Sequence, residues 1–71
     1  MIELILKTQD ETELINSYKS WSVARRASKK FILENDPDRR QNYVLCDEDD
    51  ESFFNAERLL FDATTQTYVW H

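Results

Sequence analysis

Apolar and polar residues alternate over the first residues of the chain, a period that is typical of a β-strand. In residues 1–8, three aliphatic side chains at alternate positions share one face. A polar, turn-like stretch follows, and residues 14–19 are expected to form a second strand that pairs back on the first as a hairpin. In a regular strand, Tyr18 would lie on the face opposite to Ile15.

The next segment changes to a helical period. Ser20 or Ser22 can cap its first turn by accepting a bond from a free backbone N–H, and Pro37 disfavours helical geometry in the residue before it, so the segment Asn35–Asp38 ends the helix. At about 100° per residue, one apolar arc collects Trp21, Ala24, Ala27, Ser28, Phe31 and Ile32. The opposite arc carries four cations, Arg25, Arg26, Lys29 and Lys30. Val23 and Leu33 fall outside the apolar arc.

The second half of the chain favours strands again. Residues 41–47 contain the β-type run Tyr-Val-Leu-Cys, and Asp47–Glu51 is expected to be a solvated acidic turn. Residues 52–58 are ambiguous: a strand leading into a C-terminal hairpin is preferred, and a short helix is the alternative. Residues 66–71 complete that hairpin. The prediction is an α+β fold, with an antiparallel sheet of four to five strands and one amphipathic helix packed on one face.

A chain of 71 residues makes a single domain, here residues 1–71, with a net stability of at most about 3–5 kcal/mol. A single cysteine excludes an internal disulfide and favours a reducing, cytoplasmic location. Nine aromatic residues are expected to supply much of the core. The chain has no glycine, so its turns have to be made by other residues and no glycine-dependent phosphate loop exists.

The N-terminal sequence lacks the features of a signal peptide, and no run of residues approaches the length of a membrane span. We therefore expect no membrane association. We also expect the chain, which begins at Met1, to be a complete gene product.

No group of residues is typical of a catalytic site, and the protein is expected not to be an enzyme. Cys46 and His71 form the one Cys–His combination. The acidic residues after Cys46 would raise the pKa of its thiol, which opposes activation, and His71 lies at the chain end, where chains fray. Cys46 is expected to face the core.

The acidic run does not make a metal site either. Three of its carboxylates match the first ligand positions of a calcium loop, but Ser52 stands where that loop needs glycine and Arg58 where it needs a glutamate. No metal and no cofactor are expected. The run is expected to be a solvated turn, with an acidic patch for a partner as the alternative.

The net charge of −5 hides an uneven distribution. Residues 1–18 carry −3, residues 19–40 carry +4 and residues 41–71 carry −6. The helix cations form like-charge pairs four residues apart, and two of them lie in the first half of the helix, where the helix dipole disfavours them. Three explanations stand: a solvated face, pairing with acids elsewhere in this chain or in a second copy, and binding of a negatively charged partner.

The function expected from these patterns is a non-enzymatic binding protein that docks on a protein partner and modulates or inhibits it, of a kind often encoded by phages or mobile elements. The alternative is a nucleic-acid-binding regulator that uses the basic helix, although no aromatic side chain is expected beside its cations. A homodimer is also left open. The expected partner-binding residues are Arg25, Arg26, Lys29, Lys30, Asp47, Glu48, Asp49, Asp50 and Glu51.

Overall fold

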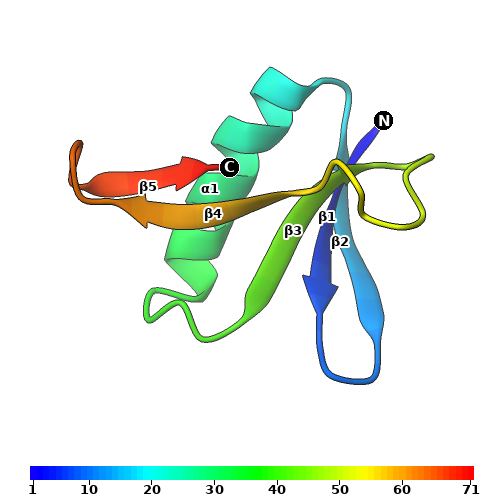
Figure 1. Cartoon of the computed structure of the whole chain (residues 1–71), viewed down its shortest axis with the longest axis horizontal. Helices are drawn as coiled ribbons and strands as arrows, with labels where there is room; N and C mark the ends of the chain where they lie inside the picture. The colour runs from blue at the N-terminus through cyan, green and yellow to red at the C-terminus, as the bar shows by residue number, and fades with distance from the viewer.

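A computed structural model describes residues 1–71 as a five-stranded antiparallel sheet with one helix packed against it (Figure 1), which confirms the predicted α+β fold. The strand order is β2-β1-β3-β4-β5. The elements are β1 (Ile2–Lys7), β2 (Thr12–Tyr18), α1 (Trp21–Asn35), β3 (Asn42–Asp47), β4 (Glu57–Asp62) and β5 (Thr67–Trp70). The helix is neither long nor apolar enough to cross a membrane.

The central strand β3 is buried on both faces, which explains its continuous apolar run. Tyr43 and Leu45 point to the side of the sheet that α1 covers and join the main core with residues of β1 and β4. Val44 and Cys46 point to the other side, where Ile5 completes a smaller core. The buried position predicted for Cys46 is confirmed.

The hairpin β1–β2 is confirmed, but the predicted faces of β2 are wrong. The pairing shifts by one residue between Leu4 and Ile5, which leaves an extra residue in β2. Such a bulge turns the side chains that follow it to the other face. Ile15 and Tyr18, three residues apart, therefore both pack against the main core.

The helix begins and ends where the sequence indicated. The hydroxyl of Ser20 accepts a bond from the N–H of Val23 and caps the first turn. Ala24, Ser28 and Ile32 are fully buried against the sheet, and the Ser28 hydroxyl donates to the carbonyl of Ala24 within the helix. The predicted apolar arc is the face that packs.

Asp36 closes the helix and builds the loop to β3. Its N–H donates to the carbonyl of Ile32, and its carboxylate accepts bonds from the N–H groups of Arg40 and Gln41 at 2.9 and 2.8 Å. These two backbone donors, with the nearby Arg39 and Arg40 charges, hold the pKa of the Asp36 carboxyl below its ordinary value.

Residues 52–56 form neither the preferred strand nor the alternative helix, and β4 begins only at Glu57. The reason is local: the carboxylate of Asp50 accepts bonds from the N–H groups of Phe54 and Asn55 and holds this stretch in turns. Phe53 and Ala56 then fold back onto the smaller core. The C-terminal hairpin that follows is confirmed as β4 and β5.

The absence of glycine has a structural consequence in the turns. Arg39, Phe53 and Gln66 have φ angles of 55°, 58° and 57°, in the left-handed region that glycine usually occupies. A residue with a side chain costs roughly 1–2 kcal/mol there. The chain tolerates three such residues, one in each loop after α1.

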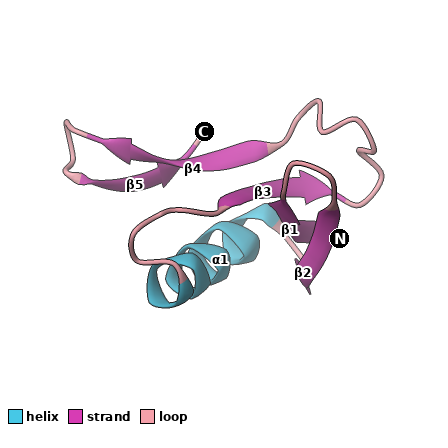
Figure 2. Ribbon diagram, turned by 90° about the horizontal axis from the view of Figure 1, so that it is seen from below, coloured by secondary structure: helices cyan, strands magenta, loops and turns pink.

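The hairpin β4–β5 diverges from the other strands soon after β4 pairs with β3. The two strands pair at Val44–Arg58 and Leu45–Glu57 alone. In Figure 1 the hairpin then crosses α1 nearly horizontally, whereas β1, β2 and β3 run closer to the vertical. Figure 2 shows α1 on one side of the sheet and the hairpin extending beyond β3. The guanidinium of Arg39 donates to the carbonyl of Leu59 at 2.6 Å, at a position where β4 no longer pairs with β3.

Candidate functional site

The larger of two hollows on the surface is a groove between the first half of α1 and β5, with a volume of about 530 Å³. The twist of the hairpin β4–β5 brings its last strand beside the helix and creates this groove. The helix supplies Ser22, Arg25, Arg26 and Lys29, and the strand supplies Thr67, Tyr68, Val69 and Trp70. We call this feature the α1–β5 groove.

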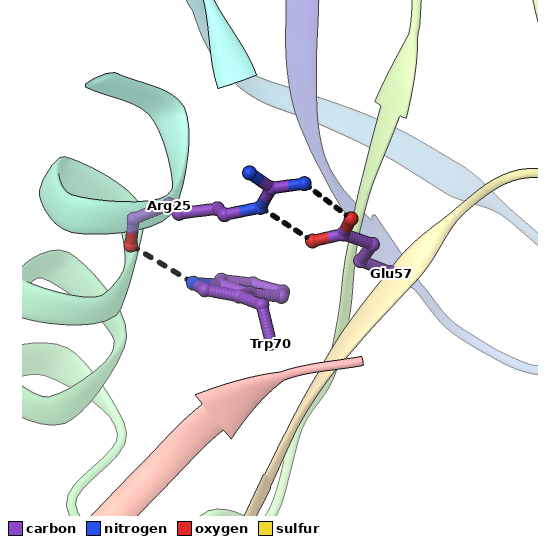
Figure 3. Close-up of polar contacts among 3 residues, drawn as sticks. All are labelled: Arg25, Glu57 and Trp70. Atoms are coloured by element: carbon purple, nitrogen blue, oxygen red, sulfur yellow. Dashed lines mark hydrogen bonds and ion pairs between the residues drawn. The ribbon is translucent and has the colours of Figure 1, made fainter. Parts of the chain in front are cut away.

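Arg25 ties the helix to both strands of the hairpin (Figure 3). Its guanidinium donates two bonds to the carboxylate of Glu57 in β4, at 2.8 and 2.6 Å. The indole N–H of Trp70 in β5 donates to the main-chain carbonyl of Arg25 at 2.8 Å. The bonds to Glu57 raise the pKa of Arg25 and lower that of Glu57. These bonds join the helix wall of the groove to the β4–β5 hairpin.

The four cations predicted as one face have different environments. Arg25 is compensated by Glu57, as one of the three explanations held. Lys29 contacts the hydroxyl of Thr67 at 3.2 Å, across the groove. Arg26 lines the groove, is exposed and forms no ion pair, whereas Lys30 is exposed and lies outside the groove. Arg26 and Lys29 thus remain as uncompensated positive charges in the groove.

Aromatic side chains do lie beside these cations, contrary to the expectation from the sequence. Tyr68 and Trp70 of β5 line the same groove as Arg26 and Lys29. Helix periodicity alone pointed to Trp21 as facing away from the cations, but even its ring lies 5.1 Å from the guanidinium carbon of Arg25. The groove combines positive charge with an apolar, aromatic strand.

The acidic residues Asp47–Glu51 lie away from this groove, at the end of β3 and in the loop that follows it, and three of them build local structure. The carboxylate of Asp47 accepts from the N–H of Asp49, and Asp50 holds the following turn. Glu48 forms an ion pair with the N-terminal amino group at 2.7 Å, which raises the pKa of that amino group. Asp49 and Glu51 are exposed.

A second, smaller hollow of about 290 Å³ lies beside this acidic loop and includes Cys46 and Glu3. Burial, followed by the charges of Glu3, Asp50 and Asp47, raises the pKa of the Cys46 thiol, so this sulfur is a poor nucleophile. No three His, Cys, Asp or Glu side chains of the chain are grouped closely enough to hold a metal ion. The main-chain groups of His71 are bonded to Arg58 in both directions, which continues the pairing of β5 with β4 to the last residue.

Sequence reasoning missed Glu57, Thr67, Tyr68 and Trp70 as parts of the site. Residues 66–71 were expected as a strand, but nothing in the pattern placed this strand beside the helix. The one usable signal was the excess of positive charge on the helix, which indicated that an acidic residue elsewhere in the chain could pair with it.

No protein-family model matches the chain, and no curated protein and no solved structure matches it either.

The carboxyls of Asp36 and Glu57 predict a dependence of stability on pH. Both have a folded-state pKa below the ordinary value, so the unfolded chain binds protons more readily. Their contribution is present above the pKa of the unfolded chain and is lost as pH falls below about 4. We expect the midpoint of urea unfolding to fall between pH 7 and pH 3, with a smaller fall for Asp36→Asn. An unchanged midpoint would contradict this account.

Proposed function

We propose that this protein is a non-enzymatic binding protein that holds an acidic, partly apolar segment of a protein partner in the α1–β5 groove, and so modulates or inhibits that partner. The observation that supports this proposal is the combination of Arg26 and Lys29 with Tyr68 and Trp70 in one groove. Cations attract the acidic groups of such a segment, and the rings offer apolar area for its other side chains.

The charge distribution of the whole chain supports a protein partner over a polyanion. The groove carries the uncompensated positive charge, while residues 41–71 carry −6 and include the exposed carboxylates of the acidic loop. A long polyanion is repelled by these other surfaces. A segment of limited length is guided to the groove by the same field.

A second candidate is a short single-stranded nucleic acid. It is favoured by one observation, the rings of Tyr68 and Trp70 beside two cations, because bases stack on aromatic side chains while phosphates contact cations. The two candidates differ in their dependence on salt, which is steep for a nucleic acid that contacts several phosphates.

Selection from a random peptide display library against the immobilised full chain tests the proposal. We expect enrichment of sequences that combine Asp or Glu with apolar residues, and loss of that enrichment when an excess of an acidic peptide competes. In parallel, fluorescence anisotropy with labelled single-stranded DNA and RNA of about ten nucleotides is expected to show no binding at low salt.

Two results would overturn the proposal. The first is a selection that enriches no acidic sequence. The second is binding of the oligonucleotides with a steep salt dependence, which would establish the nucleic-acid candidate instead.

A further inference from the structure

The outer edge of β5 is open, and its main-chain groups can be assigned from the register with β4. Arg58 and His71 bond to each other in both directions, at 2.8 and 2.9 Å. In an antiparallel ladder such two-way pairs recur at every second residue, so Val69 also points its main-chain groups at β4. The N–H and C=O groups of Tyr68 and Trp70 consequently point away from β4, and no strand follows β5 in the sheet.

This open edge borders the α1–β5 groove, because the same residues of β5 line that groove. An extended segment lying in the groove therefore meets two N–H and two C=O groups at the spacing of a strand. Pairing of this kind supplies affinity through main-chain bonds, which no side chain of β5 has to provide.

We propose that the partner segment binds as an additional strand on the edge of β5, with acidic side chains on the helix side and apolar side chains on the opposite side. The inference rests on the proposed function, since it specifies how the same groove holds its acidic segment.

The alternation follows from the surroundings of the two faces. Side chains of the added strand that point to the helix side meet Arg26 and Lys29. Those that point to the other side continue the face that carries Val69 and its pairing partner Leu60, which is half exposed. A strand of alternating acidic and apolar residues complements both faces.

The edge strand β5 is short, with four residues, but its sequence has none of the other features that protect an edge strand. Thr67–Trp70 contains no charged residue and no proline, and no bulge interrupts its pairing with β4. The other edge strand, β2, carries the exposed Glu13 and a bulge. An acidic segment is repelled from β2 and attracted to β5.

A second copy of this chain is a poorer occupant. Antiparallel pairing of two β5 strands about a two-fold axis would bring the Arg26 and Lys29 side chains of both copies to the same junction, and like charges at an interface are repelled. We therefore expect the protein to sediment as a monomer.

Three synthetic peptides test the added strand by fluorescence anisotropy with the full chain. The probe is acetyl-(Glu-Val)4-amide, and the two others carry N-methyl groups either on the two central valines or on the two central glutamates. Because alternate residues of a strand point their N–H groups to opposite edges, we expect one N-methyl peptide to bind within about threefold of the probe. The other is expected to bind at least about tenfold more weakly, since it has lost the donors that face β5.

The outcomes separate this inference from the proposed function. The added strand is overturned if the two N-methyl peptides bind equally well. It is also overturned if the library yields acidic binders while the alternating probe fails to bind. In both cases the proposal that the groove binds acidic segments stands. If neither the probe nor any library peptide binds, both proposals fail. A dimer in sedimentation together with no binding of the probe would favour a second copy as the occupant of the edge and overturn the inference.

Discussion

Replacing Leu45 with alanine is expected to leave a large fraction of the protein unfolded at 25 °C. The side chain of Leu45 is fully buried in the central strand β3, against the residues of the main core. Truncation of a buried leucine costs about 2–5 kcal/mol, through lost burial and the cavity left behind. A domain of this size has at most about 3–5 kcal/mol of net stability, so the loss is comparable with the whole. Urea unfolding followed by circular dichroism measures it.

Leu60→Ala is the matched control, because it makes the same change in the neighbouring strand β4 at a side chain that is 50% exposed. We expect it to cost less than about 1 kcal/mol. If the two variants had equal unfolding midpoints, the main core would not be the source of the stability.

Reversing the charge of Arg26 is expected to weaken binding of acetyl-(Glu-Val)4-amide by roughly tenfold. Arg26 lines the α1–β5 groove and has no acidic partner in the chain. An exposed ion pair contributes about 0.2–1 kcal/mol, and Arg26→Glu replaces this attraction with a repulsion of similar size. A difference of about 1.4 kcal/mol corresponds to a tenfold change in affinity. Isothermal titration calorimetry measures the change.

Lys30→Glu provides a control with the same change of charge on the same helix. Lys30 is exposed and lies outside the groove. Arg26 and Lys30 stand four residues apart, so either substitution turns this like-charge pair into an opposite-charge pair. Lys30→Glu also places a like charge four residues before Glu34, so the urea unfolding midpoints of both variants are compared beside their affinities. We expect Lys30→Glu to change the affinity by less than about twofold. Equal losses for both variants would indicate a general effect of charge rather than a groove.

Local patterns predicted the parts of this fold that depend on short-range physics. The cap at Ser20 and the periodic burial of Ala24 and Ile32 follow from helix geometry alone. The strand β3 follows from the β-type residues of its sequence. The bulge in β2 and the turns at residues 52–56 were not predictable in this way, because they depend on single contacts such as those of the Asp50 carboxylate.

The site was predictable only in part. Four cations on one helix face indicated either a functional surface or an acidic residue that compensates them. Glu57, paired with Arg25, is such an acidic residue. Trp70 was expected to be a strand residue, but its bond to Arg25 depends on the twist of the hairpin, which brings segments 45 residues apart into contact. The alternation of residues in a strand does not indicate whether that strand will lie beside the helix.

The proposed binding of an acidic extended segment in the α1–β5 groove can be followed residue by residue. The experiment is a titration of the 15N-labelled protein with acetyl-(Glu-Val)4-amide, followed by two-dimensional NMR. We predict that the largest shift changes occur at the main-chain amides of Arg26, Lys29 and Tyr68 and at the indole N–H of Trp70. No shift change at millimolar peptide, or changes centred on residues 47–51, would show that the α1–β5 groove does not bind such a segment.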